Sequence, residues 1–332
     1  PELKYQVKSS LNYPEDSAGR IMSRDFVSIP DNWTVREARQ YLLNNEELPD
    51  DFYTIFLVDE KTLKPTGEIA LDKLLRAKGD EKLNSIMDGE IVPVDVYTDQ
   101  EEVAHMFREY GWMSAMVVDN KGRLIGVINI DDVVEIVHEE TNEDMMLLTG
   151  AESNDVYRSV FSIFKSRSIW LVTNLFATIV AASVVGEFQD IIAQLSILAV
   201  LMPIVASMGG TTGQQTLAVV VRSLATKELN SRNALRMIGK EFMVGLCNGL
   251  LFAVMIGIAV RIWFPGQEMI SYIIALAMLC NLTVASLAGI LIPLTINRLK
   301  IDPAIASGVF LIACTDSGGY FIFLGLAKLL LF

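Results

Sequence analysis

The sequence predicts a multidomain chain, in which an α/β half that folds in water is followed by an all-α half of five membrane-spanning helices. Of the 332 residues, 52% are hydrophobic, which is too large a share for a chain that is soluble throughout. Residues 1–165 carry 33 acidic and 17 basic side chains, a net charge of −16, whereas residues 166–332 carry 7 and 10, a net charge of +3. The first half also repeats one pattern of residues twice.

The soluble half is an internal repeat with a unit of about 60 residues. Short β-branched runs alternate with amphipathic stretches in each copy, which predicts a β-α-β-β-α unit twice. We place an N-terminal linker at 1–17, the first unit at 18–82 and the second unit at 83–140. The matching segments are Ile21–Pro30 with Ile86–Val94, Thr34–Ala38 with Thr98–Ala104, Ile55–Asp59 with Ala115–Asp119, and Gly67–Asp72 with Gly126–Asp131.

Five apolar segments follow, within a membrane domain that we place at 168–332. A bilayer core requires about 20 apolar residues in a helix, and each segment is long enough. The connections after the second and fourth segments are rich in Lys and Arg, so the positive-inside rule places them and the soluble half in the cytoplasm. An odd number of spans then places the C-terminus outside. The segments are Ser168–Phe188, Ile191–Val221, Phe242–Phe264, Ile270–Ile296 and Pro303–Phe332.

Asp316 is an acid near the middle of the fifth apolar segment. An acidic side chain at the centre of a spanning helix costs ~2.5–3.5 kcal/mol on insertion scales, so it indicates a function. Its neighbours, among them Thr315, are small or hydroxylic, as along a cation path. The alternative is a buried acid paired inside the bundle. The basic residues of this half fall at the ends of apolar segments, and we expect no counter-ion and no second acid in the membrane, which favours cation coordination or proton transfer.

A polar, glycine-rich stretch lies within the second apolar segment, after Pro203. Such a stretch is tolerated inside a membrane where it lines a cavity or where it packs tightly against another helix. Because it accompanies Asp316 in a short bundle, we expect both segments to line one pore. The residues expected to line it are Gly209, Gly210, Thr211, Thr212, Gly213 and Gln214.

The end of the second repeat carries a row of acids. Asp131, Glu135 and Glu139 follow at intervals of four, so they share one face of the predicted helix, with Asp132 and Glu140 nearby. Like charges at this spacing repel by roughly a few tenths of a kcal/mol per pair, and a divalent cation would relieve that repulsion. The alternative is an acidic face that is simply solvated. We name these five acids as a candidate regulatory metal site.

An amphipathic helix is expected at 141–167, between the two halves. Its apolar residues fit a helix that lies against the inner face of the membrane before the first span. Such a helix is placed to transmit movements of the soluble half to the pore. The residues of its apolar stripe are Met145–Leu148, Val156-Tyr157, Val160-Phe161 and Phe164.

The charge and the reactive residues exclude several classes of function. An acidic domain repels phosphates, so we expect divalent cations and the lipid bilayer as partners and no nucleic acid. The three cysteines lie in apolar segments without metal-ligand spacing, and the two histidines are isolated from each other. We therefore expect no enzymatic activity.

The repeat resembles a tandem cystathionine-β-synthase (CBS) pair, which is a regulatory module. In that family the Asp that closes the Gly-x-x-x-x-Asp pattern often contacts a nucleotide ribose, and the matching residues here are Asp72 and Asp131. The resemblance thus implies a site for ATP or another adenine nucleotide. Capping of a helix N-terminus explains an Asp at these positions equally well.

The chain from about Tyr13 onward resembles the MgtE family of bacterial magnesium channels. The likeness combines the CBS pair and five spans with a Pro-x5-Gly-Gly-x-x-Gly-x-Gln second helix and an Asp-Pro-Ala…Thr-Asp fifth helix. It implies a homodimer in the bacterial inner (plasma) membrane, with an ion path on the two-fold axis between the second and fifth helices. Asp316 matches the pore acid of the family, and a backbone carbonyl near Ile312 is implied to face the ion.

Three departures bear on this resemblance. Thr211 stands where the family's Gly-Asn-x-Gly-x-Gln motif has Asn, and Gly308-Val309 replaces an Asn-Pro pair that commonly precedes the pore acid. We also expect no counterpart of the family's cytosolic N-terminal helical domain in this sequence, which is either a shortened form of the protein or a member that gates without this domain. These departures concern ion selectivity and gating more than the fold.

The predicted function is a Mg²⁺-selective channel or transporter that is gated by cytosolic Mg²⁺ bound to the acidic CBS half. Acidic side chains and rings of backbone carbonyl oxygens from two protomers suit Mg²⁺. This ion dehydrates reluctantly and is held through its waters by oxygens. One alternative is a proton-coupled carrier of divalent metals such as Mn²⁺ or Co²⁺, in which Asp316 exchanges a proton for the metal. The other is a membrane-anchored nucleotide sensor, which leaves Asp316 and the polar second helix unexplained.

Overall fold

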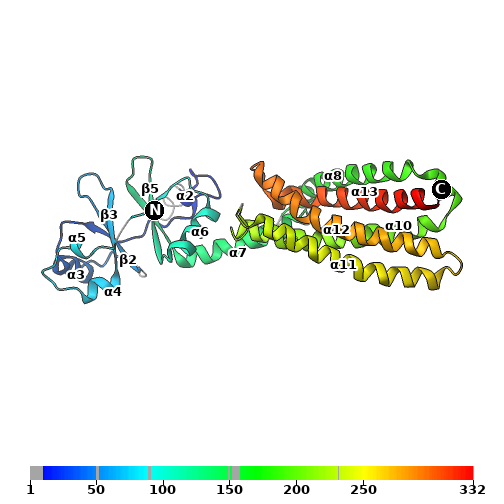
Figure 1. The fold of residues 1–332 in the computed structure, drawn as a ribbon. Helices are drawn as coiled ribbons and strands as arrows, with labels where there is room; N and C mark the ends of the chain where they lie inside the picture. Colours follow the sequence, from blue (N-terminus) through cyan, green and yellow to red (C-terminus); the bar gives the residue numbers. More distant parts are fainter. Residues whose placement is uncertain are drawn as a thin grey trace. The chain divides into compact units, whose positions relative to one another are not determined.

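A computed structural model describes residues 10–49, 52–88, 91–148, 150–151, 158–230 and 232–331. The chain forms two compact units, which divide between Thr141 and Asn142 (Figure 1). The first unit is α/β and the second contains only helices. The fold class predicted from the sequence is therefore confirmed.

The first unit contains the two predicted repeats. In each one a short helix is followed by a strand, a helix, two strands and a further helix, so the β-α-β-β-α unit is confirmed. The first repeat comprises α2 (Ala18–Ile21), β1 (Ser28–Pro30), α3 (Val35–Asn44), β2 (Thr54–Val58), β3 (Pro65–Ala70) and α4 (Leu71–Arg76). The second comprises α5 (Leu83–Ile86), β4 (Val94–Asp95), α6 (Gln100–Tyr110), β5 (Ser114–Val118), β6 (Leu124–Asn129) and α7 (Ile130–Leu147).

Each repeat builds its own three-stranded sheet. In the first sheet β2 pairs in parallel with β1 and antiparallel with β3, and β5 pairs in the same way with β4 and β6. The central strands are almost entirely buried. In both hairpins the register shifts at the same place, between Leu57 and Val58 and between Val117 and Val118. The two copies therefore share a local irregularity as well as a topology.

The helices of this unit begin where the sequence supplies caps. At the start of α3 the carboxylate of Glu37 accepts a hydrogen bond of 2.7 Å from the backbone N–H of Thr34, whose hydroxyl oxygen accepts one from the N–H of Glu37. Asp99 caps the start of α6, and Gly111, which follows its last residue, has the left-handed conformation that favours glycine. The apolar faces of these helices are buried with the sheets in two separate hydrophobic clusters.

The second unit is a bundle of long helices. Among the described residues, five helices are long and apolar enough to cross a membrane. They are α8 (Val160–Gly186), α10 (Ile197–Ala225), α11 (Ala234–Trp263), α12 (Glu268–Arg298) and α13 (Pro303–Leu331), and the short α9 (Gln189–Gln194) connects α8 to α10.

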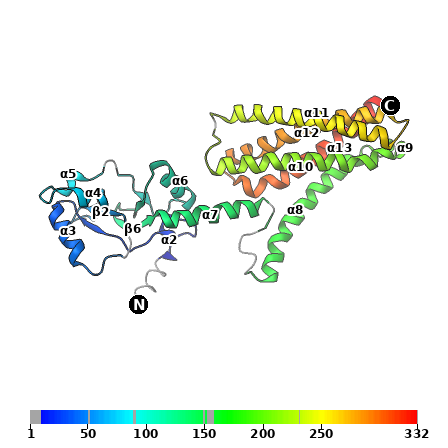
Figure 2. The ribbon, with the colours of Figure 1, turned by 90° about the horizontal axis from the view of Figure 1, so that it is seen from below.

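Helix α12 is the centre of the bundle. It packs against α10, α11 and α13, and 61% of its apolar stretch is buried, compared with 11% for α8. The first turns of α8 lean away from the other four helices (Figure 2). Pro203 lies inside α10 and does not interrupt it, so the polar stretch of this helix is helical throughout. Helices α10 and α13 both pack on α12 and also on each other.

Two predicted boundaries in the membrane half are wrong. The third span was expected to begin at Phe242, but α11 begins at Ala234 and therefore includes Glu241. Basic residues near a helix end extend their charged groups to the interface, so Lys240 does not end the span. The second span begins at Ile197 rather than at Ile191, because α9 forms a separate short helix.

The described residues of 141–167 do not form the separate amphipathic helix that was expected there. Instead, α7 ends at Leu147, and α8 begins at Val160 after Ser159, whose hydroxyl oxygen caps the helix. The part of the expected stripe at Val156-Tyr157 lies outside the described residues. The apolar residues after the cap are thus the first turns of the first span, because nothing in the sequence ends the helix before the span begins.

Candidate ion pathway

One face of α10 is polar and open in the protomer. Its buried residues follow one stripe along the helix, and the exposed residues between 207 and 218 are Ser207, Thr211, Gln214, Gln215 and Ala218. In the hydrocarbon core of a membrane, hydroxyl and amide groups need partners from water or protein. The open stripe therefore suits a surface that faces water or another polypeptide rather than lipid.

Three of the six predicted pore-lining residues lie on this open side. Thr211 and Gln214 are exposed, and Gly210 has no atom within 4 Å of the place that a Cβ would take. The Thr211 hydroxyl donates a hydrogen bond of 2.9 Å to the carbonyl oxygen of Ser207 in the preceding turn. A small residue next to two polar ones leaves room at this part of the helix.

The other three predicted residues, Gly209, Thr212 and Gly213, are buried inside the protomer. A Cβ at Gly213 would lie 2.9 Å from a methyl carbon of Leu311, so α10 and α13 approach closely there. Six consecutive residues of a continuous helix turn through all directions, and they cannot all line one face. Gly209, Thr212 and Gly213 therefore serve helix packing.

Asp316 lies half-buried on α13, level with the glycine-rich stretch of α10. Gly213 packs on Leu311, before Asp316 in the chain, and Gly209 lies near Gly319, after it, since both contact the Asn281 side chain. Within the part of the chain that the structure describes, Asp316 forms no hydrogen bond through its side chain and no ion pair. Its carboxylate oxygens are therefore available to an ion or its waters.

The side chain of Thr315 is buried, unlike that of the neighbouring Asp316. Thr315 is 2% exposed, and its hydroxyl donates to the carbonyl oxygens of Leu311 at 2.9 Å and of Ile312 at 3.2 Å. The Thr315 hydroxyl is therefore buried on the packed side of α13, where an ion in the open stripe cannot reach it. Of the predicted ion-binding residues, Asp316 is the one whose side chain is free to bind.

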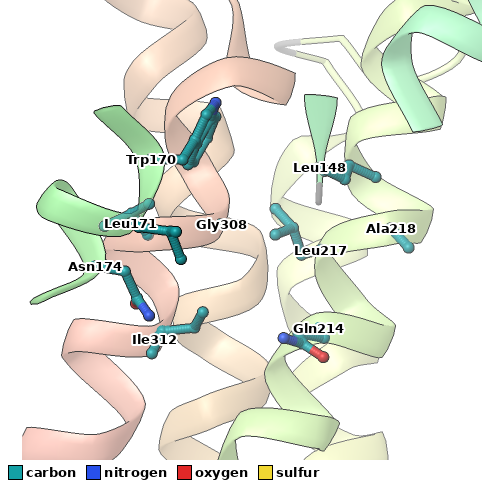
Figure 3. A pocket seen from close by; sticks show the side chains of 10 residues that line it. Leu148, Trp170, Leu171, Asn174, Gln214, Leu217, Ala218, Gly308 and Ile312 are labelled. Atoms are coloured by element: carbon teal, nitrogen blue, oxygen red, sulfur yellow. The ribbon is translucent and has the colours of Figure 1, made fainter. Parts of the chain in front are cut away.

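A cavity of about 350 Å³ lies beside these helices. Figure 3 shows Asn174 of α8 and Gln214 of α10 on opposite sides of it. The side-chain oxygen of Asn174 is buried and has no hydrogen-bond partner among the described residues. Ile312 also lines the cavity, and it precedes Asp316 by one turn of α13, roughly 6 Å along the axis. The lining residues are Leu148, Trp170, Leu171, Asn174, Gln214, Leu217, Ala218, Gly308, Val309 and Ile312.

Glu241 of α11 is a second acid inside the helical bundle, which corrects the expectation that there is none. It is 9% exposed, and its carboxylate accepts a hydrogen bond of 2.9 Å from the Thr216 hydroxyl of α10. Thr216 also packs on Gly289 of α12, so three helices meet at this point. The neighbouring Lys240 made Glu241 look like a loop residue in the sequence. A buried carboxylate with a hydroxyl donor serves packing and also marks a candidate site for a proton.

The five acids of the candidate regulatory site do not all have the same surroundings. Asp131, Glu135 and Glu139 are exposed along α7. Burial raises the pKa of Asp132, a hydrogen bond from the N–H of Asn129 opposes this, and the charges of Asp131 and Glu135 add to the rise.

Glu140 is half-buried, and its carboxylate accepts a hydrogen bond of 2.6 Å from the side-chain amide of Gln100. Among the described residues no three His, Cys, Asp or Glu side chains are grouped so that they could hold a metal ion. One chain by itself therefore presents an acidic face rather than a finished metal site.

Asp72, a predicted nucleotide contact, is exposed in the first turn of α4 and forms an ion pair of 2.7 Å with Arg76. The residue does not cap the helix, whose N-cap is Ala70 and makes no side-chain hydrogen bond. Asp131 likewise lies in the first turn of α7. A role in nucleotide binding stays a prediction for both residues.

Two family models match the chain. The MgtE model, described as a divalent cation transporter, matches residues 202–326, and the CBS domain model matches residues 18–80 and 83–139. The transporter match extends from α10 into α13 and includes both Glu241 and Asp316.

Several known proteins are similar over most of the chain. The magnesium transporter MgtE of Enterococcus faecalis is 33% identical over 324 residues, which are 98% of this chain and 71% of that protein. The magnesium transporter MgtE of Thermus thermophilus is 30% identical over 335 residues, which cover 100% of this chain and 74% of that protein. Among solved structures, the cytosolic domain of the Mg²⁺ channel MgtE in complex with ATP matches 41% of this chain and 54% of its own, at 33% identity and a TM-score of 0.39.

Proposed function

The chain belongs to the MgtE family, and we propose that it is a magnesium transporter in which Mg²⁺ passes along the α10–α13 face. We define this face as the open stripe of α10 together with Asp316 of α13. The observation that carries the proposal is Asp316 itself, an acid within a spanning helix with no partner in the described part of the protomer. An unpaired membrane acid is retained at a cost, and transport of a cation gives it a role.

The chemistry of the α10–α13 face suits a hydrated divalent cation. Mg²⁺ gives up its waters reluctantly and is bound through them by carboxylates, hydroxyls and amides. Asp316 supplies the charge, and Thr211 and Gln214 supply neutral oxygens on the facing helix. One carboxylate does not balance a divalent ion, so we infer that a second copy of the chain faces this surface and contributes a second Asp316.

We propose that the acidic face of α7 senses cytosolic Mg²⁺. The exposed acids Asp131, Glu135 and Glu139 repel the same acids of a second chain within a Debye length of ~8 Å. Bound Mg²⁺ would cancel this repulsion and favour a compact state in which the pore is closed. The sensing site is then completed by a second chain or by water.

The proposed orientation places the CBS unit and the loop between α10 and α11 in the cytoplasm, with the C-terminus outside. It rests on the basic residues of that loop, which include Lys227 and Arg232, and on the odd number of candidate spans. Single cysteines at Lys227 and at Phe332 are expected to react with an impermeant reagent from opposite sides of the membrane. Labelling of both from one side would remove the five-span arrangement.

Ion flux tests the proposal directly. Proteoliposomes containing the protein are expected to take up Mg²⁺ faster than empty liposomes, and Asp316→Asn should reduce the rate at least about tenfold because it removes the charge that holds the ion's waters. Parallel measurements with Mn²⁺ and Co²⁺ rank the three ions by their uptake rates. Equal uptake by the parent and by Asp316→Asn would refute the α10–α13 face as the path.

A proton-coupled carrier is the second candidate, and Glu241 is the observation that favours it. A relay needs a second protonatable group within the membrane, and Glu241 is buried there beside the Thr216 hydroxyl. A carrier of this kind would acidify or alkalinise the vesicle interior as the metal enters. An internal pH dye that records no change during Mg²⁺ uptake would exclude it in favour of a channel.

A further inference from the structure

One buried amide lies between the two helices of the proposed path. Asn281 is near the middle of α12 and is 1% exposed. Its side-chain nitrogen Nδ2 donates a hydrogen bond of 2.7 Å to the carbonyl oxygen of Val205 on α10. A polar side chain in the interior of a membrane protein costs free energy unless it is paired, so the bond to Val205 anchors the amide to α10.

The amide occupies a slot made by two glycines. A Cβ at Gly209 of α10 would lie 2.5 Å from Asn281 Nδ2, and a Cβ at Gly319 of α13 would lie 3.2 Å from Asn281 Oδ1. The first distance is far shorter than van der Waals contact, and the second is tight. Asn281 therefore fills the space between α10 and α13, and a larger residue at either glycine would displace it.

The slot is close to Asp316 along α13. Gly319 follows Asp316 by three residues, which is roughly 4.5 Å along the helix axis. Successive turns of an α-helix are linked by backbone hydrogen bonds and move together, so a contact that fixes Gly319 also fixes the backbone of Asp316. On α10 the slot begins at Gly209, directly before the open residues Gly210 and Thr211.

We propose that Asn281 is a positioning residue for ion selection, because it sets the separation of α10 and α13 and thereby the place of the Asp316 carboxylate. The inference rests on the proposed transport of Mg²⁺ along the α10–α13 face. Mg²⁺ demands near-ideal octahedral geometry, whereas Ca²⁺ accepts longer and more variable distances to its oxygens. A small displacement of Asp316 therefore alters the discrimination between these ions before it stops their passage.

The experiment compares initial uptake rates of Mg²⁺ and Ca²⁺ in proteoliposomes that contain the full protein. Asn281→Ala empties the slot and Gly319→Ala crowds it, and each is expected to lower the ratio of the Mg²⁺ rate to the Ca²⁺ rate by roughly fivefold or more. Gly325→Ala is the matched control on the same helix. No atom lies within 4 Å of its added Cβ, so this variant should keep the ratio of the parent.

A paired substitution separates positioning from folding. Gly209→Ala brings a methyl group against the amide and should lower both the ratio and the thermal midpoint of the purified protein. Addition of Asn281→Ala removes the atoms that this methyl group meets, so the double variant should be more stable than Gly209→Ala alone. If Asn281→Ala does not fold, Asn281→Ser and Gly319→Ala make the same comparison.

The two proposals fail in different ways. A parent protein that transports no divalent cation would overturn the proposed function and the role of Asn281 with it. A parent that transports Mg²⁺, together with Asn281 and Gly319 variants that melt earlier but keep the parent ratio, would overturn the positioning role alone. In that case Asn281 serves packing and nothing more.

Discussion

The two acids in the interior of the membrane-spanning helices lie in opposite surroundings. Glu241 is enclosed where α10, α11 and α12 meet and accepts a hydrogen bond from Thr216. Asp316 is half-buried on α13, and in the described part of the chain its side chain has no partner. A buried carboxylate that has a hydrogen-bond donor supports the packing of the helices, and one that has no donor is available to a ligand. Their surroundings, rather than their presence in the membrane, therefore distinguish their roles.

The strongest test of this contrast replaces the open acid. Asp316→Ala is expected to reduce Mg²⁺ uptake in proteoliposomes at least about tenfold and to leave the thermal midpoint near that of the parent, because the side chain supports no bond in the protomer. Uptake is measured with a Mg²⁺-sensitive dye and unfolding by a thermal scan in detergent. A variant that melts much earlier would show that Asp316 supports the fold.

The enclosed acid should behave in the reverse way. Thr216→Val removes the donor to Glu241 and leaves a buried carboxylate unpaired, so we expect a loss of roughly 1–3 kcal/mol in stability, seen as a lower thermal midpoint. Thr216→Ser keeps the hydroxyl and is the matched control. Folded Thr216→Val protein should still take up Mg²⁺. If it folds as the parent does but no longer transports, Glu241 belongs to the path.

The same contrast predicts a smaller effect on α7, where Glu135 and Glu139 are open. Replacing both with Gln should shift the Mg²⁺ concentration that protects α7 from protease to a value a few times higher, because two exposed ligands of the proposed sensor are lost. Glu60→Gln with Glu109→Gln removes the same charge from other exposed positions and is the control. Identical shifts in both double variants would indicate an effect of net charge only.

The smallest expected effect concerns Glu68 of β3. Burial raises the pKa of Glu68, and the charge of Asp88 adds to the rise, so the folded state binds a proton more readily than the unfolded chain does. The stability that this group contributes is fully present below its ordinary pKa of 4.5. It is lost as the pH rises through the higher pKa of the folded state. Glu68→Gln should therefore raise the thermal midpoint at pH 7 by about 2 °C or less, and this gain should disappear near pH 4.5. A gain that is constant with pH would contradict this account.

Much of the fold followed from local patterns. The repeat in the first half predicts both three-stranded units, because hydrophobic periodicity and turn residues act over short distances. Glu241 was missed for a similarly local reason. Arg236 and Lys240 precede it, and these charged residues were interpreted as part of a loop that ends just before the span. A bundle can bury one acid with a donor from another helix, and that donor is not visible in a linear pattern.

The candidate site depends on features that such local patterns do not predict. Asp316 and the polar stretch of α10 are evident in the sequence, but the direction of each residue around a continuous helix is not. The slot around Asn281 brings together Gly209 and Gly319, which are separated by more than a hundred positions in the chain. Contacts of this kind arise from packing, which sequence spacing does not encode.

The two hairpins of the CBS unit also indicate how the repeat arose. Both shift register at the same place, at Leu57-Val58 in one and at Val117-Val118 in the other. The turns that follow have diverged: one contains Leu63 with a φ of 56°, and the other contains Gly122 with a φ of 74°. The same bend at the same place in two copies of a repeat is most simply explained by duplication of one hairpin that already had the bend. Both copies thus kept the bend, whereas the residue with a left-handed backbone is Leu63 in one turn and Gly122 in the other.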